Sequence, residues 1–303
     1  MKTTNKQFIS YGNIGLVQLR AEPESTFSFR PGGPELRSGG LKIIEAAKEG
    51  VVGKLIAENN TEHHLLLIDG DMLAGAKQNR ILNRSILLAP GSKTVIDVSC
   101  IERLRWRYVS DDFKNPDSTA DHDLRSAKAA SASYSFGQEE GSPMETQQRV
   151  WVHIHNEMKL MNIADSTENY IELTRYSKAS KTNEIPFPEF RQEPGCNGLA
   201  VISEGKVRCI DIFGTEEVYG YYFPLLRDAA FSKALNTDRD DIVDIQEAFF
   251  RAVDALDAVG DAGRRVDEKY IGSGMMKIAE PDGLIGFELT MDGQPVHMAV
   301  FGR

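Results

Sequence analysis

The chain has 303 residues, of which 41% are hydrophobic and 26% are charged, and its formal net charge at pH 7 is −10. This composition is typical of a globular protein with a large core, and the acidic balance disfavours binding to nucleic acid polymers and to anionic membranes. The sequence has neither a membrane-length apolar run nor a signal-peptide core, and its three cysteines lack disulfide or zinc-site spacing, so we expect a cytoplasmic protein without a metal site.

The N-terminal part of the chain is predicted to consist mainly of strands. Residues 8–30 contain short apolar runs broken by glycine, which is typical of strands joined by turns. Residues 41–48 are predicted to form a short helix that stops at Gly50. The apolar runs 51–57 and 63–68 flank a polar turn, so we expect them to pair as neighbouring strands.

The clearest period-two pattern lies in residues 94–108 and predicts one long strand. Its largely apolar face carries Cys100 and Glu102 and is expected to pack inward. The opposite face carries Arg103, Arg105 and Arg107, spaced two residues apart, so that neighbours would lie about 6.7 Å apart on an extended strand.

The rest of the chain combines amphipathic helices with two antiparallel hairpins. In chain order we expect helices at 121–131, from 143 onward, at 222–235 and at 241–258, a loop at 177–194, and hairpins at 199–213 and 284–302 that turn at Glu204–Gly205 and Asp292–Gly293. The predicted fold class is therefore α+β, with a strand-rich part at 1–110 and a part made of helices and hairpins at 111–303. We expect the two parts to pack as one compact unit.

A basic strip runs from Lys77 to Arg107, with seven lysines and arginines but only two acids, a local net charge of +5. In an acidic chain, such a strip suggests a small anionic ligand rather than a polyanion. It begins with the motif GAKQNR at 75–80. Lys77 and Arg80 can hold phosphate or carboxylate, and Gln78 and Asn79 can bind hydroxyls, amides or base edges. The alternative is a solvated turn whose amides bond to the backbone.

Arg84 and Arg105 complete the candidate ligand-binding set. Arginines on one strand face repel one another unless something anionic lies among them. A bound phosphate could fill that role, and so could Asp69, Asp71 or Asp97 of the chain itself.

Cys100 and Glu102 are candidate catalytic residues. A thiolate close to arginines would have a lowered pKa and could act as a nucleophile, whereas a strand cysteine among apolar residues is usually an inert part of the core. An acid on an apolar face must be paired or protonated, so Glu102 is either half of a structural ion pair or a general base. We expect His297 to be a packing residue, although it could supply a titratable group to a cleft.

The motif GAKQNR, followed by SILL, VSCIE and RW, resembles the signature of the ARG and rhodanese-phosphatase-superfamily-associated protein domain family. The segments VWVHI and IDIFG are also similar to that family. The family name implies, by association, a connection to ADP-ribose, nucleotide or phosphate metabolism. The positions that carry the motif are Gly75, Ala76, Lys77, Gln78, Asn79, Arg80, Ser85, Ser99, Cys100, Glu102, Arg105 and Trp106.

Three functions remain open from the sequence. The first is binding or processing of a small phosphorylated ligand, such as a nucleotide or an ADP-ribose derivative. Trp106 could stack on a base, although the strand alternation points it at the core. The second is a non-catalytic interaction module that docks an acidic partner. The third is a thiol-dependent hydrolase built on Cys100, which would need a histidine within hydrogen-bond reach. No motif indicates a cofactor.

Overall fold

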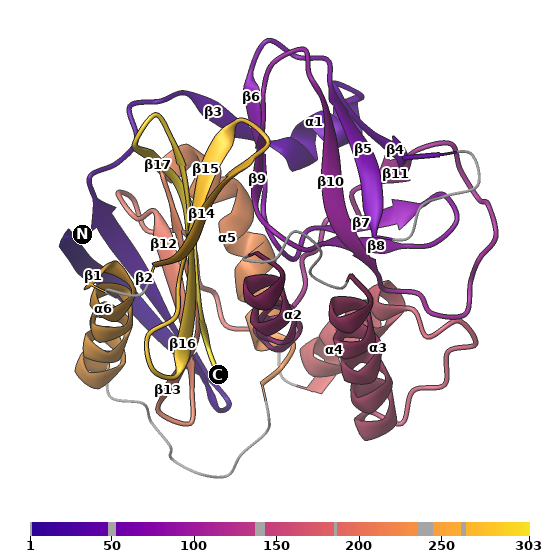
Figure 1. Cartoon of the computed structure of the whole chain (residues 1–303). Coiled ribbons are helices and arrows are strands. Elements are labelled where there is room, and N and C mark those ends of the chain that lie inside the picture. The colour runs from indigo at the N-terminus through magenta and orange to yellow at the C-terminus, as the bar shows by residue number, and fades with distance from the viewer. Residues whose placement is uncertain (1, 48–52, 137–142, 185–186, 235–244, 262–264) are drawn as a thin grey trace.

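The computed structural model describes residues 2–47, 53–136, 143–184, 187–234, 245–261 and 265–303, and these ranges form three β-sheets and six helices (Figure 1). The fold class is α+β with mostly antiparallel sheets, as the sequence predicts.

The largest sheet has eight antiparallel strands. It places the first two strands of the chain beside strands of the C-terminal third, because β2 pairs with β12. One sheet therefore contains residues from both sides of position 110. Its order is β1 (Lys2–Tyr11), β2 (Ile14–Glu22), β12 (Gly198–Ser203), β13 (Lys206–Phe213), β17 (Gln294–Gly302), β16 (Leu284–Met291), β15 (Gly274–Ala279) and β14 (Arg265–Ile271).

The two smaller sheets are built from residues 29–114 and carry the basic motif. The six-stranded sheet has the order β11 (Phe113–Lys114), β7 (Met72–Gly75), β8 (Arg80–Leu82), β10 (Lys93–Cys100), β5 (Lys54–Asn59) and β4 (Leu41–Glu45). The three-stranded sheet has the order β3 (Phe29–Pro31), β6 (His64–Leu67) and β9 (Ile86–Leu88), with β3 parallel to β6.

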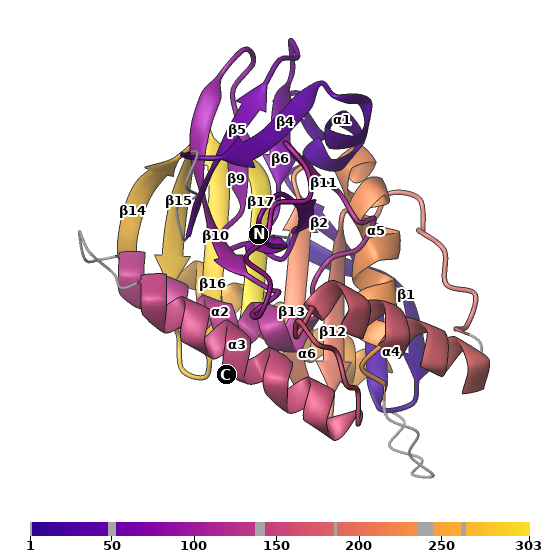
Figure 2. The same cartoon turned by 90° about the vertical axis from the view of Figure 1, so that its right-hand side faces the viewer.

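The helices cover the sheets on several sides. They are α1 (Gly32–Ser38), α2 (His122–Phe136), α3 (Pro143–Leu160), α4 (Tyr170–Glu184), α5 (Glu216–Phe231) and α6 (Ile245–Asp261). In Figure 1 the large sheet separates α6 from α5 and α2, and Figure 2 shows α3 and α4 lying across the lower ends of the sheets.

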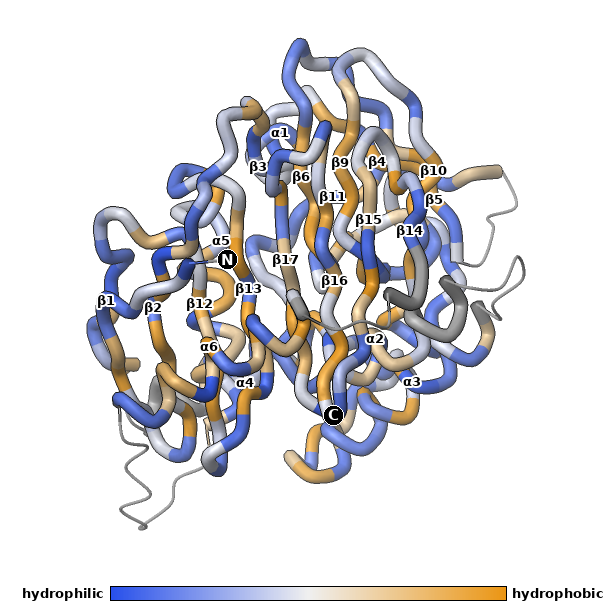
Figure 3. Tube along the Cα trace, turned by 60° about the vertical axis from the view of Figure 1, so that its left-hand side comes forward, coloured by the Kyte–Doolittle hydropathy of each residue, from blue (hydrophilic) through white to orange (hydrophobic). Residues whose placement is uncertain are grey.

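Apolar burial fixes this arrangement. Ala252 and Leu256 of α6 belong to one buried cluster with Val17 of β2, whereas Tyr222 of α5 clusters with Leu16 on the opposite face of the same strand. Successive residues of a strand point to opposite faces, so both faces of β2 must be apolar. Figure 3 shows hydrophobic segments along the strands of the large sheet.

Several predicted elements are confirmed. Residues 121–131 and the segment from 143 onward are helical, as α2 and α3. Both hairpins form in the large sheet. Their turns have positive φ at both central residues, 52° and 66° at Glu204–Gly205 and 50° and 77° at Asp292–Gly293, which is the twist that two-residue hairpin turns need.

Two predictions in the N-terminal part are wrong. Residues 41–45 form strand β4 rather than a helix, because alternation buries Leu41 and Ile43 on one face while the backbone pairs with β5. The runs 51–57 and 63–68 do not pair with each other, since β5 lies in the six-stranded sheet and β6 in the three-stranded sheet. Residues 48–52, including Gly50, lie outside the described residues.

The Asn59 side chain explains the change of sheet between β5 and β6. It donates from Nδ2 to the carbonyl oxygens of His63 (2.8 Å), Leu88 (3.3 Å) and Ala89 (2.9 Å). These bonds attach the chain to β9 immediately after β5 ends. A short-range pattern of apolar runs contains no sign of this long-range partner.

The long strand predicted at 94–108 is only partly correct. β10 ends at Cys100. Ile96, Val98, Cys100 and Glu102 are buried as expected, but Ser99 and Ile101 of the opposite face are buried as well, and Leu104, Trp106 and Tyr108 are exposed. The chain leaves the sheet because its backbone pairs instead with the loop before α4, where the Leu104 N–H donates to the Thr167 carbonyl at 3.0 Å.

Helix boundaries differ from the predictions in the second half of the chain. The predicted loop at 177–194 is wrong in its first part, since α4 continues to Glu184, and residues 185–186 lie outside the described residues. Helix α5 begins at Glu216 rather than at residue 222. Residues 241–244 of the predicted helix 241–258 lie outside the described residues, and the remainder is α6.

Within the described ranges, no helix has the length and apolar character to cross a bilayer.

Candidate anion-binding site

The GAKQNR motif forms the tight connection between β7 and β8. Gly75 has φ of 133°, and a Cβ there would lie 2.6 Å from the Ser110 hydroxyl, so only glycine fits against the returning chain. The segment 103–109 closes over this loop, with Arg107 donating its N–H to the Lys77 carbonyl at 3.2 Å and Val109 to the Ala76 carbonyl at 3.0 Å. The close backbone approach that this glycine permits is therefore made by the chain itself.

Arg105 and Glu102 hold this loop from the side. Arg105 Nε donates to Glu102 Oε2 at 2.7 Å, and the two side chains are only 12% and 5% exposed. The same guanidinium bonds to the carbonyl oxygens of Gly75 and Ala76 and to Asn79 Oδ1. Glu102 thus has the arginine partner that its inward position demands.

Gln78 and Asn79 complete the same network. Gln78 Nε2 donates to the Glu102 carbonyl at 2.9 Å, and the Asn79 N–H donates to Glu102 Oε2 at 3.3 Å. Asn79 Oδ1 also accepts from the Gly75 N–H at 2.9 Å. These contacts use much of the bonding capacity that the sequence offers for a ligand, and they make the amides and Arg105 stabilise the loop.

Arg80 differs from its neighbours because its bonding is incomplete. It is the first residue of β8, lies opposite Cys100 of β10, and is 0% exposed. Its Nη1 donates to Gln78 Oε1 at 2.8 Å and contacts the Cys100 sulfur. Its Nε and Nη2 have no hydrogen-bond partner in the described part of the chain.

Trp106 covers Arg80 from the solvent side. The Arg80 guanidinium carbon lies 5.6 Å from the centre of the indole ring, and Lys77 Nζ lies 5.7 Å from it. Both distances are within the range of cation–π attraction. Trp106 itself is 49% exposed, so one part of the indole faces water while another covers the buried arginine.

Cys100 is buried beside Arg80. Burial raises the pKa of the Cys100 thiol, and the opposing attraction of Arg80 does not outweigh burial. Among the described residues, the hydrogen-bond partners of Cys100 are Arg80 and Gln147, not a histidine. A raised pKa is the opposite of what an activated nucleophile needs, so the hydrolase hypothesis gains no support here.

Arg84 lies apart from the other candidate residues. Its Nη1 is 3.8 Å from Asp97 Oδ2, one of the acids that the sequence offered as an internal partner, and burial lowers the pKa of its guanidinium. It lines a cavity of about 10 Å³ together with Ser85 and Arg125, space for about one water molecule. The cations between 77 and 107 therefore do not gather around a single cavity.

A second polar cluster, missed by sequence reasoning, lies at the centre of the molecule. Arg125 of α2 bonds bidentately to Asp69 (3.0 and 3.0 Å) and to Asp211 (2.8 and 2.6 Å). His297 bridges Asp211 (3.1 Å) and the Ser85 hydroxyl (2.9 Å). These five residues come from five separate parts of the chain, so no local spacing could reveal them.

This central cluster has the connectivity of a serine–histidine–aspartate triad, yet its surroundings favour a structural role. Ser85, His297 and Asp211 are 4%, 3% and 2% exposed, and Arg125 already binds both Asp211 oxygens. Asp69, Asp211 and His297 also place ligand atoms within 4.8 Å of one another, as a metal site would, but the Arg125 guanidinium supplies the cation for both carboxylates.

The fold and the site define an α+β protein in which a basic motif closes around one buried, incompletely bonded arginine. The chain belongs to the ARG and Rhodanese-Phosphatase-superfamily-associated Protein domain family, whose model matches residues 2–301. A comparison with curated proteins and with solved structures found no match.

Proposed function

We propose that the protein binds a small phosphorylated ligand of the nucleotide or ADP-ribose class at Arg80, beneath the indole of Trp106. The observation that carries the proposal is the fully buried guanidinium whose Nε and Nη2 have no partner among the described residues. These two groups form one edge of the guanidinium, the edge that binds two oxygens of a phosphate in parallel. A buried charged donor without a partner is costly, and a bound phosphate would remove that cost.

The neighbours of Arg80 suit the other parts of such a ligand. Lys77 brings a second cation to the same indole ring. The half-exposed face of Trp106 can stack on a base. Glu45 has one carboxylate oxygen, Oε2, that is buried with no hydrogen-bond partner among the described residues, an acceptor suited to a sugar hydroxyl. Its other oxygen accepts from the Lys77 N–H at 3.4 Å, which places it beside the motif.

Movement of the Trp106 side chain gives access to Arg80. The backbone of the segment 103–109 is held by hydrogen bonds from Leu104, Arg107 and Val109. A rotamer change of the indole can therefore uncover the guanidinium while the segment stays in place.

Indole fluorescence tests the proposal directly. The chain has two tryptophans, and Trp151→Phe leaves Trp106 as the reporter. The Trp151 indole N–H is buried with no partner in the part of the chain that the structure describes, so this change removes no hydrogen bond there. In this background we expect ADP-ribose or AMP to change the emission saturably, and ribose 5-phosphate to bind more weakly because it has no base. Arg80→Gln in the same background is expected to abolish the response.

Arg84→Gln is the matched control, since Arg84 lies elsewhere and pairs with Asp97. It should leave binding unchanged. A thermal melt of each variant establishes that it folds. Trp106→Ala removes the indole, so its ligand binding is measured by calorimetry. This variant should keep phosphate binding but lose the preference for AMP over ribose 5-phosphate. The proposal is wrong if none of these phosphorylated compounds gives a saturable signal, or if Arg80→Gln binds as well as its parent.

A second candidate function, docking of an acidic partner, has its own supporting observation. Leu104, Trp106, Tyr108 and Val109 are each about half exposed or more, a row of large apolar side chains on one short segment. Arg103 lies beside them and is 47% exposed. Apolar contacts framed by cations fit an acidic peptide with hydrophobic residues, and such binding would weaken with salt. Leu104→Ala should weaken docking but not the binding of AMP.

A further inference from the structure

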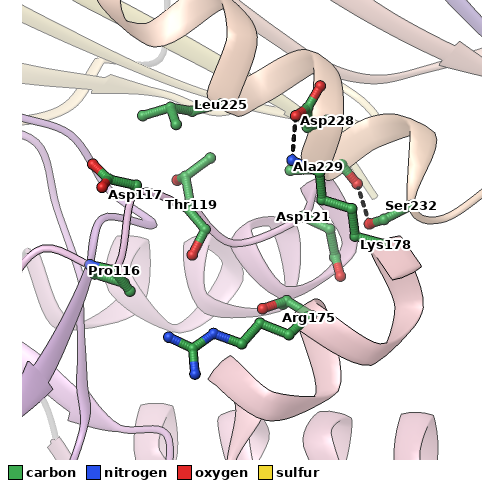
Figure 4. A pocket seen from close by; sticks show the side chains of 12 residues that line it. Pro116, Asp117, Thr119, Asp121, Arg175, Lys178, Leu225, Asp228, Ala229 and Ser232 are labelled. Carbon is green, nitrogen blue, oxygen red and sulfur yellow. Dashed lines mark hydrogen bonds and ion pairs between the residues drawn. The ribbon is translucent and has the colours of Figure 1, made fainter. Parts of the chain in front are cut away.

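A cavity of about 190 Å³ lies between the loop that leads into α2 and the helices α4 and α5 (Figure 4). Thr119 and Asp121 line it from the loop, Arg175 and Lys178 from α4, and Asp228 from α5. Because three separate elements form its walls, the cavity is a product of tertiary packing, and none of the motif residues lines it.

Thr119 marks this cavity as a binding site. The residue is 2% exposed, and its hydroxyl Oγ1 is buried with no hydrogen-bond partner in the described ranges. A hydroxyl loses favourable free energy when it is removed from water without a new partner. In Figure 4, Thr119 lies between Asp117 on one side and Asp121 and Asp228 on the other, with Arg175 below it. A ligand in the cavity would supply the missing partner.

The rim of the cavity carries charges of both signs. Lys178 Nζ lies 2.5 Å from Asp228 Oδ2 across the gap between α4 and α5, and these side chains are 53% and 21% exposed. Arg175 (63% exposed) pairs with Glu172, and Asp117 (64% exposed) pairs with Arg37, so one further cation and one further anion can turn toward a ligand. Such exposed pairs contribute little to stability, so exchanging them for ligand contacts costs little.

We propose that this cavity binds a small zwitterion that carries both an amine and a carboxylate, of the size of a free amino acid. The ligand carboxylate would bind Lys178 and Arg175, and its amine would bind Asp228 and Asp117. The ligand would thus replace the Lys178–Asp228 ion pair without burying net charge. Leu225 and Ala229 supply an apolar wall for a side chain. A cavity of about 150 Å³ is known to hold the six carbon atoms of benzene, so this one has room for about eight non-hydrogen atoms.

Calorimetry and thermal shift with the twenty L-amino acids test the proposal on the intact chain. We expect at least one of them to bind saturably and raise the melting temperature. Its decarboxylated amine and its deaminated acid should bind about tenfold more weakly or worse, because each lacks the charge that would replace one side of the Lys178–Asp228 ion pair.

Thr119→Val is the most specific variant, because it removes the unpaired hydroxyl at nearly constant shape and breaks no hydrogen bond in the described structure. It should keep or raise the melting temperature yet weaken amino acid binding by about three- to tenfold. Arg80→Gln should leave this binding unchanged, which separates the two sites. The proposal fails if no amino acid binds, if the single-charge analogues bind equally well, or if Thr119→Val binds like the wild type.

Discussion

At the scale of single residues, two ionisable side chains with shifted pKa values are expected to make the stability of this protein depend on pH. Asp71 is partly buried beside the central cluster, where it accepts hydrogen bonds from the Ile68 N–H (2.9 Å) and the Tyr222 hydroxyl (3.1 Å). Burial nevertheless raises the pKa of Asp71 to about 7. Nearby, burial lowers the pKa of Lys128 to about 8, and its ammonium donates to the Leu82 carbonyl at 2.6 Å. Both groups therefore titrate close to neutral pH.

Replacement of Asp71 by Asn should change the pH dependence of stability. The pKa of Asp71 in the folded state is about 7, above its ordinary value of 3.8, so its contribution is fully present below pH 3.8 and is lost as the pH rises through 7. We expect the wild type to lose stability relative to Asp71→Asn between about pH 4 and 7, by up to about 1.4 kcal/mol per pH unit. Urea unfolding measured at several pH values gives both curves, and parallel curves would contradict the assignment.

At the scale of elements, local sequence signals correctly predicted strands whose pairing partner lies nearby in the chain. The two hairpins follow from their Glu204–Gly205 and Asp292–Gly293 turns, because such turns fix the pairing of adjacent strands. The start of α5 was missed although its signal is present. Thr215 accepts a hydrogen bond from the Val218 N–H at 3.3 Å and caps the helix, whose first residue, Glu216, lies six residues before the predicted start.

Removal of this cap gives a prediction for α5. Thr215→Ala should destabilise the protein by about 1 kcal/mol, because the first turn of α5 loses the acceptor for an otherwise unpaired N–H. Thr215→Ser keeps a hydroxyl in the same place and should lie close to the wild type. Denaturant midpoints of the three proteins provide the measurement, and equal losses for Ala and Ser would show that the hydroxyl has no capping role.

At the scale of the whole molecule, Arg125 connects parts of the chain that are far apart in the sequence. It joins Asp69, which precedes β7, to Asp211 in β13 of the large sheet. Burial alone would raise the pKa of both carboxyl groups, but attraction to Arg125 outweighs it and holds both below their ordinary range. The ion pairs therefore couple the motif-bearing sheets to the large sheet through α2.

Arg125→Met should destabilise the protein by about 3–5 kcal/mol, because two buried carboxylates lose the cation that compensates them. Asp69→Asn combined with Asp211→Asn in the same variant should recover part of the loss. For the wild type we expect one cooperative transition, with far-UV circular dichroism and tryptophan fluorescence coincident. A loss below about 1 kcal/mol, or two separated transitions, would show that Arg125 does not couple the parts.

The sequence by itself determined the α+β class, the hairpins, most helices and the family, since these depend on periodicity, turn residues and motif letters that lie close together along the chain. It also placed Arg80 in the candidate site. Only the tertiary structure decided which of the basic side chains already bind other groups of the protein. Glu102 pairs with Arg105, Asp97 lies by Arg84, and Trp106 turns outward over Arg80. Hydrogen bonds and ion pairs act over a few ångströms between residues far apart in the chain, so their outcome follows from packing and not from local spacing.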